Sequence, residues 1–309
     1  MLKIIDDKET CKRSIYFLGI RLCGWTRSKL ILERINNTLN HVERSVEFLM
    51  CDRSDSLEAK GGDRNLQLIQ IKFLNAFDAF CKDHKLHYWL DFGTLLGAAR
   101  NSKFIPWDDD IDVSMLRGGG DFEAILNLEK SKKIIFDGYY FKYYPEIGLI
   151  KLHNQCLPEY IGMDIFVLDL IGRRMTIAEK VSLTRSLNSD PIFKNKSLST
   201  QRSAYFARKL HNFGFDFVDN FADAETVVYG FEFHHASHPS IFLDKDELFP
   251  LRTTQFEGRS YPCPKNLDHH LTLLYGNYKT PNWKQLPHTL ISKLPIEDLI
   301  KISHFIERQ

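Results

Sequence analysis

The stretch FGTLLGAARNSKFIPWDDDIDVSM, residues 92–115, places four aspartates within five positions, after a tryptophan and before a hydrophobic alternation. These aspartates are Asp108, Asp109, Asp110 and Asp112. Residues two apart on a strand share a face, so the carboxylates of Asp110 and Asp112 are expected to point the same way. Adjacent negative charges raise each other's pKa unless a cation joins them. The stretch therefore predicts a strand whose entrance binds a positive group.

The type of ligand indicates which positive group this is. Carboxylate oxygens at this spacing suit a hard divalent cation, Mg²⁺ or Mn²⁺, that keeps part of its water shell and also contacts substrate phosphates. A further aspartate, Asp164, lies between Met163 and Ile165 in another expected strand. If the two strands are neighbours, Asp164 either joins the metal site or takes the proton from an attacking hydroxyl. A solvated acidic turn is the alternative for Asp108 and Asp109.

The residues before the aspartates have the features of a phosphate-binding turn. Gly93 allows close approach of the backbone, and Thr94 lies where a helix is expected to begin, with a hydroxyl and free N–H groups. A simple helix N-cap is the other interpretation of Thr94. The order of strand, Gly-Thr, helix, Asp-x-Asp strand and later strand aspartate resembles that of nucleotidyltransferase-fold enzymes.

Hydrophobic periodicity predicts an α+β chain, or a mixed α/β one, with a small mixed sheet flanked by helices. Heptad-like spacing predicts a helix within 27–50 that packs on its own core or forms a homodimer seam. Nine basic residues against two acidic ones over 171–212 fit either a solvated helical face or contact with an anionic lipid surface.

We expect four regions: an N-terminal helical extension and linker (1–64), a catalytic core (65–170), a basic helical insertion (171–228) and a C-terminal part of the catalytic domain (229–309).

Composition excludes several classes of function. A net charge of +1 argues against bulk electrostatic binding to nucleic acid. No apolar run approaches the roughly 20 residues of a membrane span, and the acidic start MLKIIDDKET is unlike a secretory signal. The six cysteines are scattered without a CxxC pair, as in a reduced cytoplasmic protein. His234, His235 and His238 offer imidazoles for zinc, but they lie in a polar loop without a nearby cysteine.

Three segments together resemble the LicD/fukutin family of phosphotransferases. They are DFGTLLGAARNSKFIPWDDDIDVSM at 91–115, YIGMDIFVLDL at 160–170 and ELFPLRTTQFEGRSYPCPKNLDHHLTLLYGNYKTPN at 247–282. The segments occur in the family's order, whereas 1–64 and 171–229 match no family motif. SIYFLGIRLCGW, at 14–25, also resembles a lead-in of bacterial surface-polysaccharide transferases, which work on capsule or lipopolysaccharide precursors at the inner face of the cytoplasmic membrane.

The family resemblance implies a function and a set of site residues. It implies transfer of a phosphorylated alcohol, such as phosphocholine, ribitol phosphate or glycerol phosphate, from a CDP-linked donor to a hydroxyl of a cell-surface glycan or its lipid-linked precursor. It also implies Mg²⁺ on Asp110 and Asp112, with Asp164 as a further ligand or as the base. The implied substrate-binding residues are Gly93, Thr94, Arg100, Lys103, Trp107 and Lys151. For the two lysines the alternative is a solvated position on the surface. Trp107 either shapes the pocket or belongs to the core.

Two other functions stay open. A nucleotide-sugar glycosyltransferase also uses Asp-x-Asp for metal binding, but it would begin with a longer run of alternating parallel strands and helices and would prefer uridine or guanosine. A non-catalytic relative that binds glycans or partner chains would lack the carboxylates or have a blocked pocket. Asp110, Asp112 and Asp164 are all present, which favours an enzyme.

Overall fold

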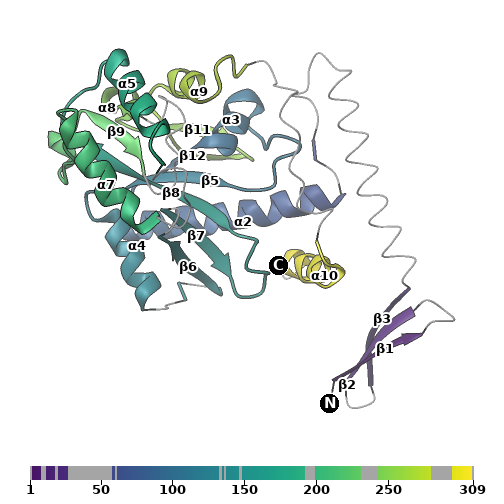
Figure 1. The fold of residues 1–309 in the computed structure, drawn as a ribbon. Helices are drawn as coiled ribbons and strands as arrows, with labels where there is room; N and C mark the ends of the chain where they lie inside the picture. The colour runs from purple at the N-terminus through teal and green to yellow at the C-terminus, as the bar shows by residue number, and fades with distance from the viewer. Residues whose placement is uncertain are drawn as a thin grey trace.

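The fold combines helices with a mixed sheet, which confirms the expected α+β class (Figure 1). The computed structural model describes residues 2–7, 12–17, 20–26, 58–59, 61–131, 134–135, 137–145, 148–191, 199–230, 242–279 and 294–307. Its helices are α2 (Gly61–His84), α3 (Phe92–Asn101), α4 (Asp121–Lys130), α5 (Ile177–Asn188), α7 (Ser199–Asn212), α8 (Lys245–Leu248), α9 (Leu267–Tyr275), α10 (Ile296–Glu307) and the short 3-10 helix η3 (Phe221–Asp223). The helix expected within 27–50, and the homodimer through it, lie outside the described residues.

The main sheet has seven strands and is built around β8. Its members are β4 (Trp89–Leu90), β5 (Asp112–Leu116), β6 (Tyr139–Tyr144), β7 (Leu149–Asn154), β8 (Met163–Ile171), β9 (Thr226–Tyr229) and β10 (Phe242–Asp244). On one side β8 pairs with β5, which pairs with β4. On the other side the first half of β8 pairs with β7 and its second half with β9. Among the described strands, β5 and β8 form the one parallel pair.

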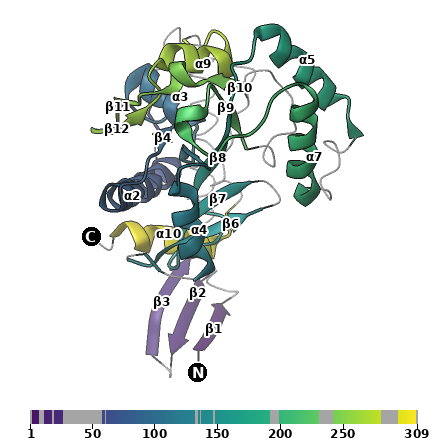
Figure 2. The same cartoon turned by 90° about the vertical axis from the view of Figure 1, so that its left-hand side faces the viewer.

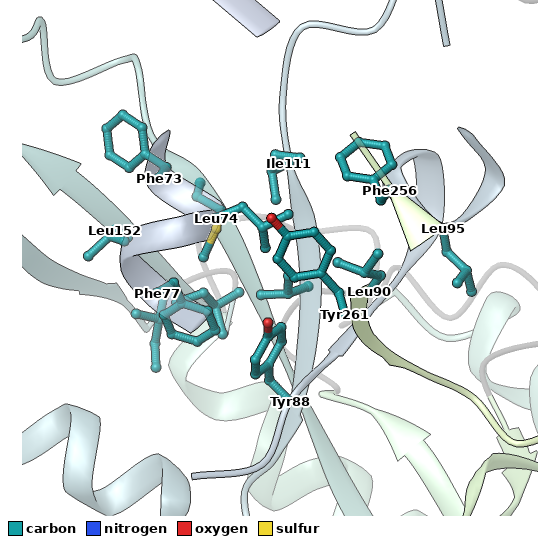
Figure 3. Close-up of a cluster of buried hydrophobic side chains, with 14 of the residues drawn as sticks. Phe73, Leu74, Phe77, Tyr88, Leu90, Leu95, Ile111, Leu152, Phe256 and Tyr261 are labelled. Carbon is teal, nitrogen blue, oxygen red and sulfur yellow. The ribbon is translucent and has the colours of Figure 1, made fainter. Parts of the chain in front are cut away.

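Helices cover both faces of this sheet, and Figure 2 shows α2 and α7 on opposite sides of it. On the α2 side, Phe73 and Phe77 are fully buried in one apolar cluster with Ile111 and Leu152 (Figure 3). On the opposite side, Phe206 of α7 is buried in a second apolar cluster that includes alternate residues of β8. Because side chains of a strand alternate between faces, β8 contributes to both cores, and its whole length is fixed.

The helix α2 begins earlier than its apolar stripe suggested. Residues 61–65, expected in the linker, form its first turn, where Asp63 is buried and placed favourably for the helix dipole. From Leu66 onward the helix follows the predicted spacing of buried residues, which continues to Phe80. The spacing of apolar residues thus predicted the position of α2 correctly, whereas its polar first turn was predicted as a loop.

The N-terminal residues form a separate antiparallel sheet rather than a helix. Its strands are β1 (Leu2–Asp7), β2 (Lys12–Phe17) and β3 (Ile20–Thr26). They lie within the expected helical extension 1–64, and the strand conformation agrees with their isoleucine, tyrosine and phenylalanine residues, which favour strands. A third small sheet pairs β11 (Arg252–Phe256) with β12 (Arg259–Cys263).

The region 171–212 is helical only in part. Ile171 ends β8, and α5 then begins at a capping box in which Thr176 and Glu179 satisfy each other's backbone N–H groups. The expected division of the chain into four regions stays a prediction. None of the helices in the described part of the chain combines the length and apolar character that crossing a bilayer requires.

Candidate active site

Three charged side chains lie in a row across neighbouring strands; we call Lys151, Asp164 and Asp112 the charged row. The parallel pair β5–β8 sets Asp112 opposite Asp164, and β7 sets Lys151 opposite Asp164 on the other side. Opposite residues of adjacent strands carry side chains on the same face, roughly 5 Å apart. Lys151 Nζ lies 2.6 Å from Asp164 Oδ1, an ion pair whose side chains are 28% and 17% exposed. The two aspartate-bearing strands are therefore neighbours.

Two buried glutamines of α2 fix the backbone that leads into these strands. Gln67 Nε2 donates a hydrogen bond to the Asp108 carbonyl at 2.9 Å. Gln70 Nε2 donates to the carbonyls of Asp109 and Gly162, both at 3.2 Å. Asp109 precedes β5 and Gly162 precedes β8, so a single side chain ties together the entrances of both acidic strands.

Both glycines of the GTLLG motif face the loop at 102–111 between α3 and β5, which we call the acidic loop. A Cβ atom on Gly93 would lie 2.6 Å from Asp108 Oδ2, and one on Gly97 would lie 2.4 Å from the Lys103 carbonyl oxygen. The two glycines are one helical turn apart and so share a face of α3. The Gly93 N–H also donates to Asp112 Oδ2 at 3.2 Å. The close approach expected at Gly93 is made here by protein carboxylates.

Replacement of Gly97 by alanine is expected to lower the free energy of unfolding by about 2 kcal/mol. Overpacking typically costs about 1–3 kcal/mol and here falls at the upper end because the contact is with backbone, whereas the better helix propensity of alanine returns about 1 kcal/mol. The matched change Gly93→Ala meets the end of the Asp108 side chain, which can move, and should cost less. Urea denaturation measures both values. Equal unfolding midpoints for Gly97→Ala and the unchanged protein would contradict the expectation.

A buried carboxylate, Asp91, joins four elements directly behind the charged row. Its Oδ1 accepts hydrogen bonds from the Phe92 N–H at 2.9 Å and from His270 Nε2 at 2.7 Å. Its Oδ2 accepts from Ser114 Oγ at 2.6 Å and from the Tyr229 hydroxyl at 2.7 Å. Burial alone would raise the pKa of Asp91, but the charge of His270 and these hydrogen bonds outweigh it and hold the pKa below its ordinary value.

The Asp91 network also holds a strained residue at the start of α3. Phe92 has a φ of +41°, a left-handed conformation that a bulky residue rarely adopts. Its ring packs against Phe166 and Tyr229, with centroid separations of 4.6 and 5.1 Å. This backbone turn precedes Gly93, whose N–H donates to Asp112. Strain of this kind persists only where the surroundings enforce it, and here they aim a backbone donor at the charged row.

The carboxyl groups at the site repel one another. Burial raises the pKa of Asp108 and Asp112 well above the ordinary value, and the charge of Asp110 raises both further. Burial also raises the pKa of Asp164 to about 6, against the opposing effect of the Lys151 ammonium group. Asp108 Oδ2 is buried, and no described residue donates a hydrogen bond to it. The cluster is therefore short of positive charge.

A hard divalent cation fits this deficit, because the donor atoms are carboxylate oxygens. Asp110 and Asp112 are the residues that would hold it, with Asp164 across the sheet. Within the residues that the structure describes, no three Asp, Glu, His or Cys side chains are already arranged to hold a metal. A cation that keeps part of its water shell needs only one or two of these carboxylates as ligands. The three histidines at 234, 235 and 238 lie outside the described residues.

Thr94 has a structural partner in this arrangement. The residue is 1% exposed, and its Oγ1 accepts a hydrogen bond from the Asp112 N–H at 2.9 Å. The N-cap of α3 is Asp91 rather than Thr94, because the carboxylate of Asp91 accepts from the first N–H of the helix. Thr94 therefore fixes the start of β5, and its hydroxyl is not open to solvent.

The other expected substrate-binding residues lie around α3 and the acidic loop. Arg100 Nε and one terminal nitrogen donate to the Tyr278 carbonyl at 2.9 and 2.6 Å, which ties α3 to the chain after α9. Lys103 forms an exposed ion pair with Glu58. Trp107 is partly buried and packs against the core on the α2 side. The structure brings Lys151, but not Lys103, into contact with an aspartate of the site.

Sequence reasoning missed several residues that shape the site. Gln67 and Gln70 are polar residues among the buried positions of α2. Polar residues at such positions indicate buried hydrogen bonds, so both could have been predicted from the sequence. Tyr275 of α9 lies near the cluster, since burial and then the charge of Asp112 raise the pKa of its hydroxyl. Its segment was noted only for its family resemblance. The roles of Asp91 and His270 depend on contacts between distant parts of the chain, which no local pattern reveals.

A model of the LicD/FKTN/FKRP nucleotidyltransferase domain matches residues 85–181, the part of the chain that contains the charged row, the GTLLG motif and the acidic loop. Residues 85–181 therefore resemble the nucleotidyltransferase domain of the LicD/fukutin family. The family resemblance inferred from the sequence is thereby confirmed.

Known relatives extend the similarity beyond that domain. The chain is 25% identical over 255 residues to the lipopolysaccharide cholinephosphotransferase LicD of Haemophilus influenzae, covering 73% of this chain and 95% of that protein. It is 38% identical over 55 residues to the ribitol 5-phosphate transferase FKRP of Homo sapiens, covering 18% of this chain and 11% of that protein. The FKRP of Mus musculus matches to the same extent.

Proposed function

We propose that this chain transfers a phosphorylated alcohol from a CDP-activated donor to a hydroxyl of a cell-surface glycan or its lipid-linked precursor. The observation that carries the proposal is the similarity to the cholinephosphotransferase LicD, which spans 95% of that protein. The strand-paired Asp112 and Asp164 within the matched domain supply the chemistry such a transfer needs. The second relative is named for ribitol 5-phosphate, so the alcohol differs between relatives.

The proposed reaction assigns a task to each carboxylate. A Mg²⁺ or Mn²⁺ ion on Asp110 and Asp112 would neutralise the donor diphosphate and stabilise the charge that develops during transfer. The acceptor hydroxyl gives its proton to the carboxylate of Asp164, and its oxygen bonds to the phosphorus of the phosphoalcohol. The bond from that phosphorus to the bridging oxygen breaks, and the electron pair leaves with CMP. The protein thus contributes mainly orientation and charge.

Sheet topology favours this reaction over sugar transfer. The glycosyltransferase alternative predicted a long run of alternating parallel strands and helices. In the described part of the chain, β5–β8 is the one parallel pair and every other pairing is antiparallel. A single parallel pair that carries both aspartates agrees with the nucleotidyltransferase-like core.

Calorimetric titration with CDP, UDP and GDP, each with and without Mg²⁺, tests the proposal. We expect CDP to bind most tightly, to need Mg²⁺, and to lose at least about tenfold in affinity in Asp110→Asn, because one charge-assisted metal ligand is removed. Asp83→Asn, the same change at an exposed position of α2, is the matched control and should bind like the unchanged protein.

The same titration distinguishes the alternatives. Tighter binding of UDP or GDP than of CDP would replace the proposal with the glycosyltransferase function. If no nucleotide binds under any condition, the non-catalytic alternative is favoured and the carboxylates have another role.

A further inference from the structure

The charged row continues onto a fourth strand. β6 pairs with β7 so that Lys142 lies directly opposite Lys151. Lys142, Lys151, Asp164 and Asp112 therefore follow one another across β6, β7, β8 and β5. One half of the row carries two ammonium groups, and the other half carries carboxylates.

Two lysines directly opposite each other are unfavourable in a sheet unless negative charge lies close to both. Lys142 forms an ion pair with Glu159, whose side chain is 59% exposed, and Lys151 forms one with Asp164. Neither ammonium group is sealed in the core, since the Lys142 and Lys151 side chains are 39% and 28% exposed. The row thus places two ion-paired but partly exposed ammonium groups next to the acidic cluster, where a soluble anion can reach them.

The acidic cluster creates a problem for any phosphate substrate, because a diphosphate is repelled by Asp112 and Asp164. A metal ion held by Asp110 and Asp112 would neutralise one side of that site only. The Lys151 ammonium group lies on the other side, 2.6 Å from Asp164 Oδ1 in an ion pair that is partly exposed to solvent. A lysine on a flexible stem can exchange such a partner for a phosphate oxygen.

We propose that Lys151, supported by Lys142, is the cationic half of the active site and binds substrate phosphate opposite the metal. The inference rests on the proposed function and makes it more specific: Asp164 belongs to Lys151 and is not a metal ligand. When phosphate binds, the Lys151 ammonium group moves to a phosphate oxygen. The freed Asp164 carboxylate then takes the proton of the acceptor hydroxyl as that oxygen bonds to phosphorus and CMP leaves with the electron pair.

Calorimetry with two simple probes tests the role of Lys151 without a known substrate. The probes are Mn²⁺ alone and inorganic pyrophosphate in excess Mg²⁺, applied to the full chain and to Lys151→Met, Lys151→Arg and Lys142→Met. Lys301→Met is the matched control, because Lys301 also forms an ion pair with an aspartate, at 2.8 Å, on the distant helix α10.

The expected effects of Lys151→Met have opposite signs. Pyrophosphate affinity falls about tenfold, since a charge-assisted contact is lost, whereas Mn²⁺ affinity is unchanged or rises, since a positive charge leaves the cluster. Lys151→Arg keeps pyrophosphate binding within about threefold. Lys142→Met weakens it less than Lys151→Met, and Lys301→Met changes neither affinity.

Three results of the probe titrations would overturn the inference. The first is a Lys151→Met variant that binds pyrophosphate as tightly as the protein without substitutions. The second is a Lys151→Met variant that loses affinity for both pyrophosphate and Mn²⁺, which a purely structural role would produce. The third is failure of the protein without substitutions to bind pyrophosphate. The proposed function is tested separately by whether the protein prefers CDP over UDP and GDP. A failure of the proposed function can therefore be told apart from a failure of the inference about Lys151. An Asp164→Asn protein that loses Mn²⁺ affinity as severely as Asp112→Asn would also place Asp164 on the metal, against the inference.

Discussion

Asp112→Asn is expected to lower the rate of phosphotransfer by about 10³-fold or more while leaving the fold intact. Asp112 is paired with Asp164 across the parallel strands, and the Gly93 N–H is aimed at its carboxylate. Removal of one group that stabilises developing charge costs about 10²–10³-fold, and loss of the metal costs more. An asparagine oxygen still accepts the Gly93 hydrogen bond, so the local backbone is preserved.

The stability of this variant should move in the opposite direction from its activity. Burial and neighbouring negative charges raise the pKa of Asp112 well above its ordinary value, so the ionised carboxylate is unfavourable in the folded protein without metal. Neutral asparagine relieves that repulsion. We therefore expect the metal-free variant to unfold at the same temperature as the unchanged protein or higher, a trade-off typical of active sites.

Release of CMP from CDP-choline and CDP-ribitol measures the activity, and thermal unfolding with and without Mn²⁺ measures the stability. Mn²⁺ should raise the unfolding temperature of the unchanged protein and of Asp83→Asn, but not that of Asp112→Asn. Transfer within tenfold of the unchanged rate would show that the Asp112 carboxylate is not needed. A marked drop in unfolding temperature would instead assign Asp112 a structural role.

Local patterns in the sequence predicted those parts of the fold in which burial has a clear period. The stripe from Leu66 to Phe80 located α2, and the alternation of Ile111 and Val113 with Asp110 and Asp112 located β5. Strand β6 (Tyr139–Tyr144) went unpredicted because its sequence, YYFKYY, offers almost no polar contrast between its two faces. The N-terminal strands fell within an extension judged helical from the spacing farther along the chain.

The site was predictable to the extent that its chemistry is local. Asp110, Asp112 and Asp164 were identified because carboxylates are rare in alternating strands and their repulsion demands an explanation. That Asp112 and Asp164 lie opposite each other follows from the pairing of β5 with β8, which is separated in sequence and set by the packing of two cores. Arg100 illustrates the limit, because its bond to the Tyr278 carbonyl joins residues far apart in the chain.

Asp91→Ala is expected to lower the free energy of unfolding by about 3–5 kcal/mol. The Asp91 carboxylate is 0% exposed and accepts four hydrogen bonds, one of them from His270. Each buried donor that loses its acceptor costs about 1–3 kcal/mol, so removal of an acceptor shared by several buried donors reaches this total. Ser114 and Tyr229 would also lose the acceptor of their hydroxyl groups, and each unsatisfied buried donor adds to the loss.

The effect should depend on pH in a defined direction. The pKa of Asp91 is held below its ordinary value, so the network stabilises the fold above the unfolded-state pKa of about 3.9 and loses that contribution as the pH falls through the lowered pKa. The difference in stability between the unchanged protein and Asp91→Ala is therefore full at pH 7 and shrinks below about pH 4. Urea denaturation at a series of pH values measures it.

A control and a gentler substitution separate the network from a general effect of losing an aspartate. Asp121→Ala removes a partly exposed carboxylate that accepts from the His87 N–H, and it should cost less than about 1 kcal/mol. Tyr229→Phe deletes one donor and keeps the ring, at a cost of about 1 kcal/mol. Because Tyr229 and Ser114 donate to the same Asp91 oxygen, Tyr229→Phe combined with Ser114→Ala should depart from additivity, which a double-mutant cycle detects. If the two changes in the free energy of unfolding were strictly additive, the two hydroxyls would not act through Asp91. The carboxylate would then be an isolated helix cap, whose loss costs about 1 kcal/mol rather than about 3–5 kcal/mol.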